Sequence, residues 1–299
     1  MQPKRIKRRI DGVLLLDKPR GISSNQALQQ AKRLFLAAKA GHTGSLDPLA
    51  TGLLPLCLGE ATKFSHYLLD ADKSYRAHIK LGITTTTGDA EGEVLQKQDV
   101  ALEISEVKAV LSTFMGSIHQ VPPMYSALKH QGKPLYSYAR DGVEIERKSR
   151  EVMIHNISLE RFHHDELEIL VSCSKGTYIR TLAEDIGAEL GCGAHLSGLR
   201  RLSTGHFKLE AAVTLEHLES MPLEERDMLL LKPDSLISSL PEVLLDETSA
   251  YYIQRGQRVW QAGLIPKGMF RIYGPEHSFL GLGEQVEDGK IAPKRLLQT

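Results

Sequence analysis

The segment most informative about the architecture of this chain is GHTGSLDPLATGLLPLCLGEATKF, residues 41–64. Its first part, residues 41–48, contains glycines and a proline, which exclude a regular helix and predict a tightly folded loop. Asp47 lies on this loop, where the backbone can direct a carboxylate toward a cleft. Because aspartate before proline is also ordinary turn chemistry, Asp47 alone is compatible with a purely structural turn as well.

Regular elements are predicted outward from this loop on both sides. Apolar runs bounded by turn residues predict strands over residues 12–16, 77–82 and 168–173. Apolar positions on one face predict helices over residues 26–38, 105–114 and 178–190. Ser23 can cap the first of these helices, and Gly191 is a natural stop for the last.

Two segments depart from this pattern. Residues 120–150 are polar, basic and tyrosine-bearing, with two prolines near their start, so they predict an excursion from the core. After Leu245, short glycine-spaced alternating pieces predict a small all-β module. At 299 residues the chain is long enough for one large domain and one small one.

The charge composition does not by itself indicate a nucleic-acid binder. Lys and Arg together number 37, as do Asp and Glu, so the formal net charge is zero. Two local clusters are basic, an arm at residues 4–9 and the segment 120–150. Such clusters can hold phosphates without a basic average, although a solvated face or a disordered tail is the other reading.

Several classes of protein are disfavoured by the sequence. No run approaches the ~18 apolar residues of a membrane span, and residues 1–9 lack the apolar part of a signal peptide, so we expect a cytoplasmic protein. Cys57, Cys173 and Cys192 form no CxxC pair and predict small buried hydrophobes rather than disulfides or a zinc site.

Nucleotide cofactors and metals are not expected either. The chain has no phosphate loop, no HExxH helix and no complete GxGxxG fingerprint. His163 and His164 are adjacent, so on a strand they would point to opposite faces and could not share a metal. We expect them to be ordinary surface histidines.

The segment 41–64 as a whole resembles the catalytic motif of the bacterial tRNA pseudouridine-55 synthases, the TruB family. Further stretches resemble the same family: LLLDKPRGISS (14–24), DKSYRAHIKLGITTTTGDAEGEV (72–94), PPMYSALKHQGKPLYSYARDG (122–142) and CSKGTYIRTLAEDIGAELGCGAHLSGLRR (173–201). Together these stretches cover most of residues 12–206, and they are too long and particular for a chance match.

The resemblance implies an α+β core with a mostly antiparallel mixed sheet and the catalytic loop in a cleft. It implies a catalytic domain over residues 1–246, with an RNA-binding insertion at about 120–150, and a PUA-like RNA-binding β domain over 247–299. The implied activity is isomerisation of uridine 55 in the T-loop of tRNA to pseudouridine, without a cofactor. We expect tRNA, bound through its T-arm, as the partner of a monomer that requires no protein partner.

Site residues carry over from the family by matching positions. Asp47 matches the catalytic aspartate, Tyr75 the aromatic stacked against the target base, and Arg180 the partner of Asp47. Residues implied to bind the substrate are His42, Tyr178, Leu199, Lys18 and Lys63. An arginine within pairing distance would favour the ionised carboxylate that a nucleophile or base requires.

Other readings of the same residues stay open. An arginine at a helix start commonly pairs with any nearby acid, and Tyr75 and Tyr178 can be core aromatics. The chain could be an RNA-binding helper of tRNA folding that opens the tRNA elbow without chemistry, or it could take a guide-RNA-directed target. The presence of Asp47, Tyr75 and Arg180 together favours catalysis, and the compact tail and basic excursion favour a stand-alone tRNA enzyme.

Overall fold

The computed structural model describes residues 7–261 and 267–298, and its centre is a mixed sheet. The strands of this sheet are β1 (Gly12–Lys18), β2 (Ala40–His42), β3 (Thr51–Leu58), β4 (Lys73–Leu81), β7 (Gly116–Gln120), β10 (Arg150–His163), β11 (Glu166–Cys173), β12 (Ala194–Thr204), β13 (Phe207–Lys208) and β14 (Val213–Thr214). The main order is β14-β1-β3-β12-β4-β11-β10-β7, with β2 beside β3 and β13 beside β12. Among the described strands of this sheet, only β1–β14 and β3–β12 are parallel pairs. The predicted α+β class with a mostly antiparallel mixed sheet is confirmed.

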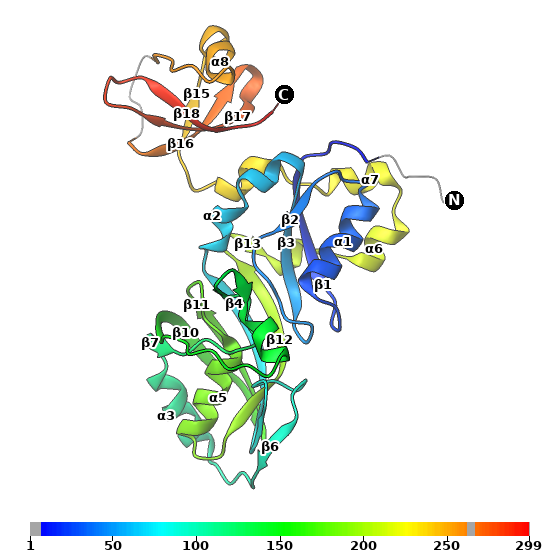
Figure 1. Cartoon of the computed structure of the whole chain (residues 1–299), viewed down its shortest axis with the longest axis vertical. Coiled ribbons are helices and arrows are strands. Elements are labelled where there is room, and N and C mark those ends of the chain that lie inside the picture. Colours follow the sequence, from blue (N-terminus) through cyan, green and yellow to red (C-terminus); the bar gives the residue numbers. More distant parts are fainter. Residues whose placement is uncertain (1–6, 262–266, 299) are drawn as a thin grey trace.

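Helices cover one face of this sheet along most of its length (Figure 1). The α-helices are α1 (Ser24–Leu34), α2 (Ser65–Leu69), α3 (Ile104–Thr113), α4 (Leu135–Arg140), α5 (Ile179–Glu189), α6 (Leu215–Ser220), α7 (Leu223–Met228) and α8 (Glu247–Gln254). The 3₁₀ turns are η1 (Gly59–Lys63), η2 (Leu209–Ala211), η3 (Pro233–Ile237) and η4 (Pro275–His277). One apolar core takes side chains from α1, α3, α5 and α6. These four helices therefore pack on the same side.

β1 and β3 are buried on both faces because a second core lies behind them. Leu14 and Leu16 of β1 point into the helix-covered core, whereas Val13 and Leu15 point into the second core with Leu53 of β3. This division follows the alternation of side chains along a strand. A strand with two apolar environments has a continuous apolar sequence, as residues 12–16 show.

β3 was not predicted as a strand, and it contains Pro55. The Pro55 carbonyl accepts the backbone N–H of Thr43 at 3.2 Å. The backbone of Pro55 therefore faces Thr43, at the end of β2, and not β1. The missing N–H for this reason does not interrupt the hydrogen bonds between β3 and β1. A proline is tolerated in a buried strand here because β2 and β12 each pair with only a part of β3.

The helix predicted over 26–38 is shorter in the structure and ends at Leu34. Ser23 caps it as expected, in a capping box with Gln26. Leu36 adopts a left-handed φ of 51°, and the N–H groups of Leu36 and Ala37 bond back to Arg33 and Lys32. This is a Schellman ending built on leucine instead of glycine, which hides it from sequence reading. The helix predicted over 178–190 has the same ending at Gly191, as expected.

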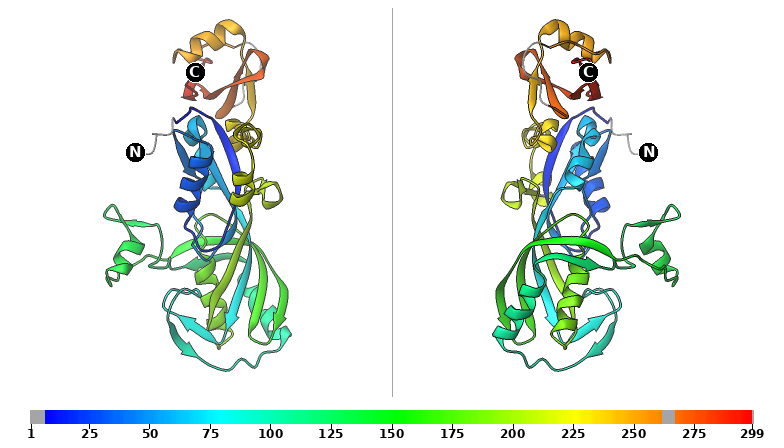
Figure 2. Two further views of the ribbon diagram at one scale, coloured as in Figure 1. Left: turned by 90° about the vertical axis from the view of Figure 1, so that its right-hand side faces the viewer. Right: turned by 90° about the vertical axis from the view of Figure 1, so that its left-hand side faces the viewer.

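Residues 120–150 leave the sheet after β7 and return at β10. Figure 2 shows this green segment projecting sideways from the body of the molecule. It contains the short pair β8 (Lys129–His130) and β9 (Lys133–Pro134), followed by α4. A second small hairpin, β5 (Ile83–Thr85) with β6 (Val94–Lys97), follows β4. We call residues 120–150 the excursion.

The C-terminal module is a separate four-stranded sheet, in the order β15-β16-β17-β18. Its strands are β15 (Glu242–Leu244), β16 (Met269–Gly274), β17 (Ser278–Gln285) and β18 (Ile291–Leu296). It has its own apolar core, to which α8 contributes Ala250 and Ile253. β15 pairs with β16, so this sheet takes in residues that precede the predicted boundary at 246/247.

The remaining expectations concern single residue types. The three cysteines are free and buried, as predicted. His163 and His164 lie exposed at the end of β10, which confirms them as surface residues. Within the described part of the chain, no group of three or more His, Cys, Asp or Glu side chains is arranged to hold a metal ion. None of the described helices has both the length and the apolar character needed to cross a membrane.

Candidate active site

The loop between β2 and β3 is clamped to the start of α1. The Leu46 N–H donates to Ser24 Oγ at 2.7 Å, and Ser24 Oγ donates to the Leu46 carbonyl at 2.9 Å. Pro48 accepts the N–H of Gly21 at 2.8 Å. Ser24 is buried, so these bonds are shielded from water. The loop is irregular but well held, and it presents Asp47 at a fixed place.

Asp47 pairs with Arg180, the second residue of α5. Arg180 Nε lies 3.1 Å from Asp47 Oδ2 and 3.7 Å from Asp89 Oδ2. The same guanidinium donates through Nη2 to the Tyr125 carbonyl at 2.6 Å and through Nη1 to the Thr87 carbonyl at 3.4 Å. One buried arginine thus joins four segments: the loop between β2 and β3, the hairpin after β4, the excursion and α5.

The two members of the main ion pair differ in exposure. The Arg180 side chain is 6% exposed, whereas that of Asp47 is 44% exposed and can be reached by a substrate. Burial nevertheless raises the pKa of Asp47 above its ordinary value; Arg180 and Lys18 oppose this, and Asp89 adds to it. The expectation that Arg180 decides the ionisation of Asp47 is therefore incomplete, because burial outweighs the arginine.

Asp89 is a site residue that sequence reasoning did not single out. Its carboxylate is buried and accepts the Thr87 hydroxyl at 2.6 Å and the Glu91 N–H at 3.1 Å. The sequence shows Asp89 only as an acid in a polar loop. An aspartate in a Thr- and Gly-rich turn is a weak indication of a site residue. Neither its burial nor its proximity to Arg180 can be read from the spacing.

Tyr75 lies on β4, facing the helix-covered core beside the site. It is 8% exposed, and its direct partner across the strand pair is Arg201. Burial raises the pKa of Tyr75, and the positive charge of Arg201 acts in the opposite direction. The negative charge of Asp47 adds slightly to the rise in the pKa of Tyr75.

Lys18 and His42 also lie near the loop. Lys18 is fully buried, and its Nζ donates to the carbonyls of Ile22 at 2.6 Å and Pro19 at 2.8 Å. Burial lowers the pKa of Lys18 to about 8, against the attraction of Asp47. Burial likewise lowers the pKa of His42, and its Nδ1 has no hydrogen-bond partner among the described residues.

Tyr178 and Leu199 lie on two other elements, Tyr178 directly before α5 and Leu199 on β12. The Tyr178 N–H donates to Gln120 Oε1 at 3.0 Å, and Gln120 Nε2 donates back to the Tyr178 carbonyl at 3.3 Å. This clamp ties the N-terminus of α5 to the start of the excursion. Leu199 packs partly buried against the main core, and its carbonyl accepts the Thr51 hydroxyl at 3.4 Å.

Lys63 is not brought to this site. Its Nζ bonds to Glu60 Oε2 at 2.5 Å and to the Leu296 carbonyl at 2.8 Å. These contacts join η1 to the last strand of the C-terminal module. Its expected contact with the substrate remains a prediction, and the structure supplies another role.

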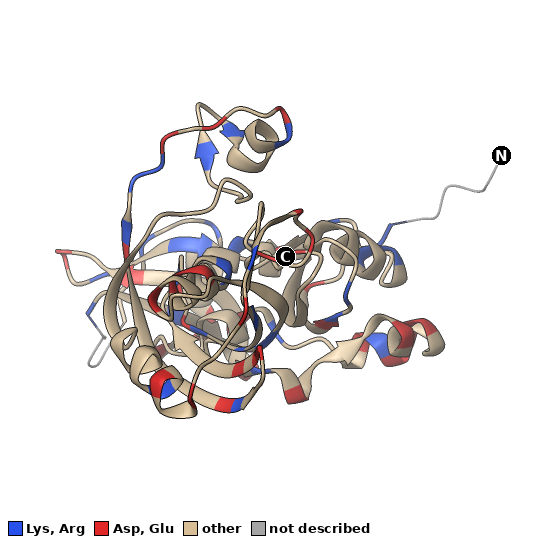
Figure 3. Ribbon diagram, turned by 90° about the horizontal axis from the view of Figure 1, so that it is seen from below, with Lys and Arg blue, Asp and Glu red and all other residues tan. Residues whose placement is uncertain are grey.

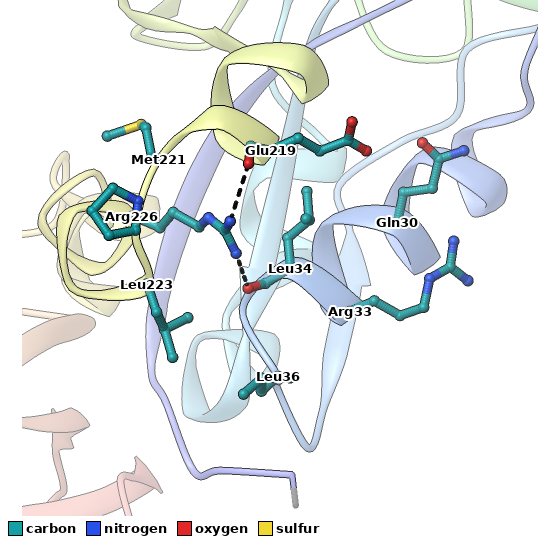
Figure 4. Close-up of a pocket in the computed structure, with 9 residues that line it drawn as sticks. Gln30, Arg33, Leu34, Leu36, Glu219, Met221, Leu223 and Arg226 are labelled. Atoms are coloured by element: carbon teal, nitrogen blue, oxygen red, sulfur yellow. Dashed lines mark hydrogen bonds between the residues drawn. The ribbon is translucent and has the colours of Figure 1, made fainter. Parts of the chain in front are cut away.

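Cavities on the described surface include two of different size. The larger, about 560 Å³, lies between α1 and the α6–α7 turn, where Arg226 donates to the carbonyls of Leu34 and Glu219 (Figure 4). None of the predicted site residues lines it. The smaller, about 330 Å³, is lined by Thr87 and Tyr125, which both bond to Arg180 through their carbonyls. The chemistry of the site points to the second location, beside the base of the excursion.

Known proteins match the chain along its whole length. Residues 32–179 match the TruB family pseudouridylate synthase N-terminal domain model, residues 180–244 the tRNA pseudouridylate synthase B C-terminal domain model, and residues 241–297 the Pseudouridine synthase II TruB C-terminal model. The protein named tRNA pseudouridine synthase B from Methylobacillus flagellatus is 65% identical over 100% of this chain and 99% of its own length. Its namesake from Nitrosospira multiformis is 54% identical over 98% and 97% of the two chains.

Solved structures agree with these matches. A chain of a Cbf5-Nop10-Gar1 complex superposes with a TM-score of 0.71 at 26% identity, covering 96% of this chain and 84% of that one. The three matched family models all describe pseudouridylate synthases, and this is the class to which the chain belongs. Within that class, the extent and identity of the matches show that the chain belongs to the TruB family.

Proposed function

We propose that this enzyme converts uridine 55 in the T-loop of tRNA to pseudouridine, with Asp47 as the essential catalytic carboxylate. The observation that carries the proposal is the ion pair between Asp47 and Arg180, on a clamped loop that is open to solvent. The names of the relatives, tRNA pseudouridine synthase B, support tRNA as the substrate. Such an enzyme would work in the cytoplasm, where its substrate is.

The reaction breaks the N1–C1′ glycosidic bond, turns the uracil and forms a C5–C1′ bond, so the detached base must be held away from water. Asp47 could attack C1′, add to C6 of the ring or remove the ribose 2′ proton. The last step removes the proton from C5, for which the Tyr75 hydroxyl or a water is the candidate base. The raised pKa of Tyr75 makes the neutral hydroxyl its resting form.

A uridine inside a folded tRNA arm is stacked, so the enzyme must extrude it at a cost of roughly a few kcal/mol. We assign Tyr75 to stack on the extruded base and Tyr178 and Leu199 to line its pocket. His42 and Lys18 would lie along the RNA loop, and we propose that the excursion closes on the T-arm. Figure 3 shows Lys and Arg segments along the excursion, with acidic segments among them.

Tritium release from C5 of uridine in a labelled tRNA transcript tests this function. Wild-type protein, purified alone and without a guide RNA, should release tritium. Asp47→Asn should abolish the release, as should a transcript mutated at the T-loop uridine. Asp70→Asn is the matched control, because Asp70 is exposed and pairs with Lys175 at the surface.

Each contrary outcome has a definite meaning. Release that persists with Asp47→Asn would show that the catalytic residue is wrongly assigned. Release that persists with the mutated transcript would exclude position 55 as the sole target. Tight binding of tRNA without any release by the wild type would favour the RNA-binding folding helper, and a requirement for a guide RNA would favour the guided enzyme.

A further inference from the structure

Arg201 is a buried cation without an acidic partner. Its side chain is 1% exposed, and no acidic side chain in the described part of the chain is among the groups that act on its pKa. One guanidinium nitrogen, Nη2, has no hydrogen-bond partner there. Burying a charge in this way is costly, so an apolar residue would serve packing better. The groups that Arg201 does contact therefore indicate its purpose.

These contacts lie at the catalytic loop and at Tyr75. Arg201 Nε donates to the Leu53 carbonyl at 2.6 Å, just after the loop. A Cβ on Gly44, within the loop, would lie 3.9 Å from Arg201 Nη1. On β12, Arg201 is in register with Gly52 of β3 on one side and with Tyr75 of β4 on the other. The guanidinium thus links both ends of the loop to the strand that carries Tyr75.

Arg201 can act on Tyr75 because the two are direct partners on neighbouring antiparallel strands. The side chains of such partners leave the sheet on the same face and lie close together. A positive charge at this position favours negative charge on the phenolic oxygen, and so it prepares that oxygen to interact with a base in the site.

We propose that Arg201 is a positioning residue that acts through Tyr75: it places a positive charge beside the strand partner Tyr75 and ties the strand of Tyr75 to the loop that precedes β3. Because Arg201 is buried beneath the loop, it does so without touching the substrate. This inference rests on the proposed function, which assigns Tyr75 to the target base. The adjacent Arg200 cannot replace it, since Arg200 pairs with Asp17 at 2.6 Å and is 37% exposed.

A double-mutant cycle tests the proposal. Single-turnover rates of pseudouridine formation and the Kd for tRNA would be measured for Arg201→Gln, Arg201→Lys, Tyr75→Phe and the two double variants, with Arg200→Gln as the matched control. We expect Arg201→Gln to slow the reaction on the order of ten- to a hundredfold at an unchanged Kd. Arg201→Lys should recover part of the rate. In the Tyr75→Phe background, either Arg201 substitution should have little further effect.

A titration that needs no activity gives a second readout. The ultraviolet absorbance of tyrosinate should show one tyrosine that titrates at higher pH in Arg201→Gln than in the wild type, and that is missing from Tyr75→Phe. An unchanged titration, an equal loss of rate in both tyrosine backgrounds, or a loss confined to Kd would each overturn the proposal. If Arg201→Gln does not fold, the same comparison of backgrounds with Arg201→Lys decides the matter.

Failure of this inference can be told from failure of the proposed function. Wild-type protein that forms no pseudouridine in the tRNA transcript would refute the function itself. Equal rates for the wild type and Arg201→Gln, with normal pseudouridine formation, would refute only the role of Arg201.

Discussion

Arg180 is the residue that contacts the largest number of separate segments at the candidate site. Its guanidinium serves Asp47 and Asp89 through Nε and two carbonyls through its other nitrogens. Asp47 and Asp89 share one cation, and their negative charges repel each other. The charge of Asp89 therefore contributes to the raised pKa of Asp47. The arginine therefore orients Asp47 more than it lowers the pKa of that carboxyl.

Asp89→Asn should change the pH dependence of the reaction. If Asp47 acts as the ionised carboxylate, as we propose, activity is present above the pKa of Asp47 and is lost as the pH falls through it. Asp89 raises that pKa, so its removal should move the acidic limb of the rate profile to lower pH. The rate on the plateau should fall on the order of tenfold, because Arg180 loses a partner that fixes it.

Single-turnover rates measured across the acidic range would check this, with Glu93→Gln as a control in the same hairpin. Glu93 is exposed, so its removal should leave the profile in place. An acidic limb that moves to higher pH with Asp89→Asn would contradict the electrostatic account of Asp47.

A residue could be assigned to the site from the sequence when both it and its partner lie in stretches that resemble the family. The spatial pairing of Asp47 with Arg180 follows from the resemblance alone, since 133 positions separate them. Asp89 and Arg201 escaped because burial and tertiary proximity give them their importance. Lys63 lies within the motif, yet η1 turns it toward the C-terminal module, a contact that the sequence does not indicate.

Among the elements, the excursion is anchored to the site at its base and extends freely beyond it. Gln120 at its start bonds to the backbone of Tyr178, and the Tyr125 carbonyl accepts from Arg180. Its outer part holds itself together through local contacts, such as Lys133 with Asp141 at 2.6 Å. A segment fixed at its base and held only by local contacts further out is suited to close on a ligand.

Neutralising Lys129, Lys133 and Lys148 together should weaken tRNA binding and lower its salt dependence. Removing one lysine–phosphate pair reduces the slope of log K against log salt by about 0.9 for a duplex. We expect a decrease of about 2, because Lys133 is already paired within the excursion. Binding would be measured from low to physiological salt.

The control removes the same number of lysines elsewhere, at Lys97, Lys108 and Lys208, which are exposed on other elements. An unchanged affinity and slope after neutralisation of the excursion would refute its contact with the T-arm. Equal effects of both triple variants would indicate general electrostatic attraction instead.

Gly52→Ala should destabilise the protein more than any strain in φ explains. Gly52 has a φ of +99°, and a Cβ there would lie 2.3 Å from the Arg201 carbonyl oxygen. Gly116 has a similar φ of +94° with no atom within 4 Å of the same position. Gly116→Ala should therefore cost about 1–3 kcal/mol, from strain alone. Gly52→Ala should cost several kcal/mol more or prevent folding, because β3 and β12 must separate.

Urea unfolding of both variants measures the difference. Equal losses of stability would mean that the close approach of β3 to Arg201 is not required. The two glycines have similar φ values, so the difference in stability between the two variants reports packing and not backbone strain.

Element prediction succeeded where local chemistry determines the outcome. Gly191 ends α5 as expected, because glycine adopts the left-handed conformation without strain. α1 ends at Leu34 because Leu36, just beyond it, adopts the left-handed conformation. A leucine gives no signal of this in the sequence. β3 was missed because Pro55 argues against a central strand, and only the partial pairing of its neighbours makes that proline acceptable.

On the scale of the whole molecule, the C-terminal module docks on the second core of the catalytic sheet. Leu282 of β17 is buried among residues of β1, β3 and η3. Phe279 lies against Phe64 with ring centroids 5.6 Å apart. The buried apolar contact fixes the module against the end of the sheet away from the excursion (Figure 2). Any RNA held by both parts must therefore reach from the excursion to the module at the end of the molecule (Figure 2).

Lys63→Met tests whether this docking or the RNA is the purpose of Lys63. Lys63 Nζ binds the Leu296 carbonyl and Glu60, and Glu60 in turn accepts the Gln298 N–H at 2.6 Å. Removing the ammonium should cost about 1.5–3 kcal/mol of stability and speed amide hydrogen exchange in residues 296–298. The salt slope of tRNA binding should not change. Lys175→Met, which breaks an exposed pair, should cost less than about 1 kcal/mol. A slope reduced by about 0.9 with exchange unaltered would instead show that Lys63 leaves the module to bind a phosphate.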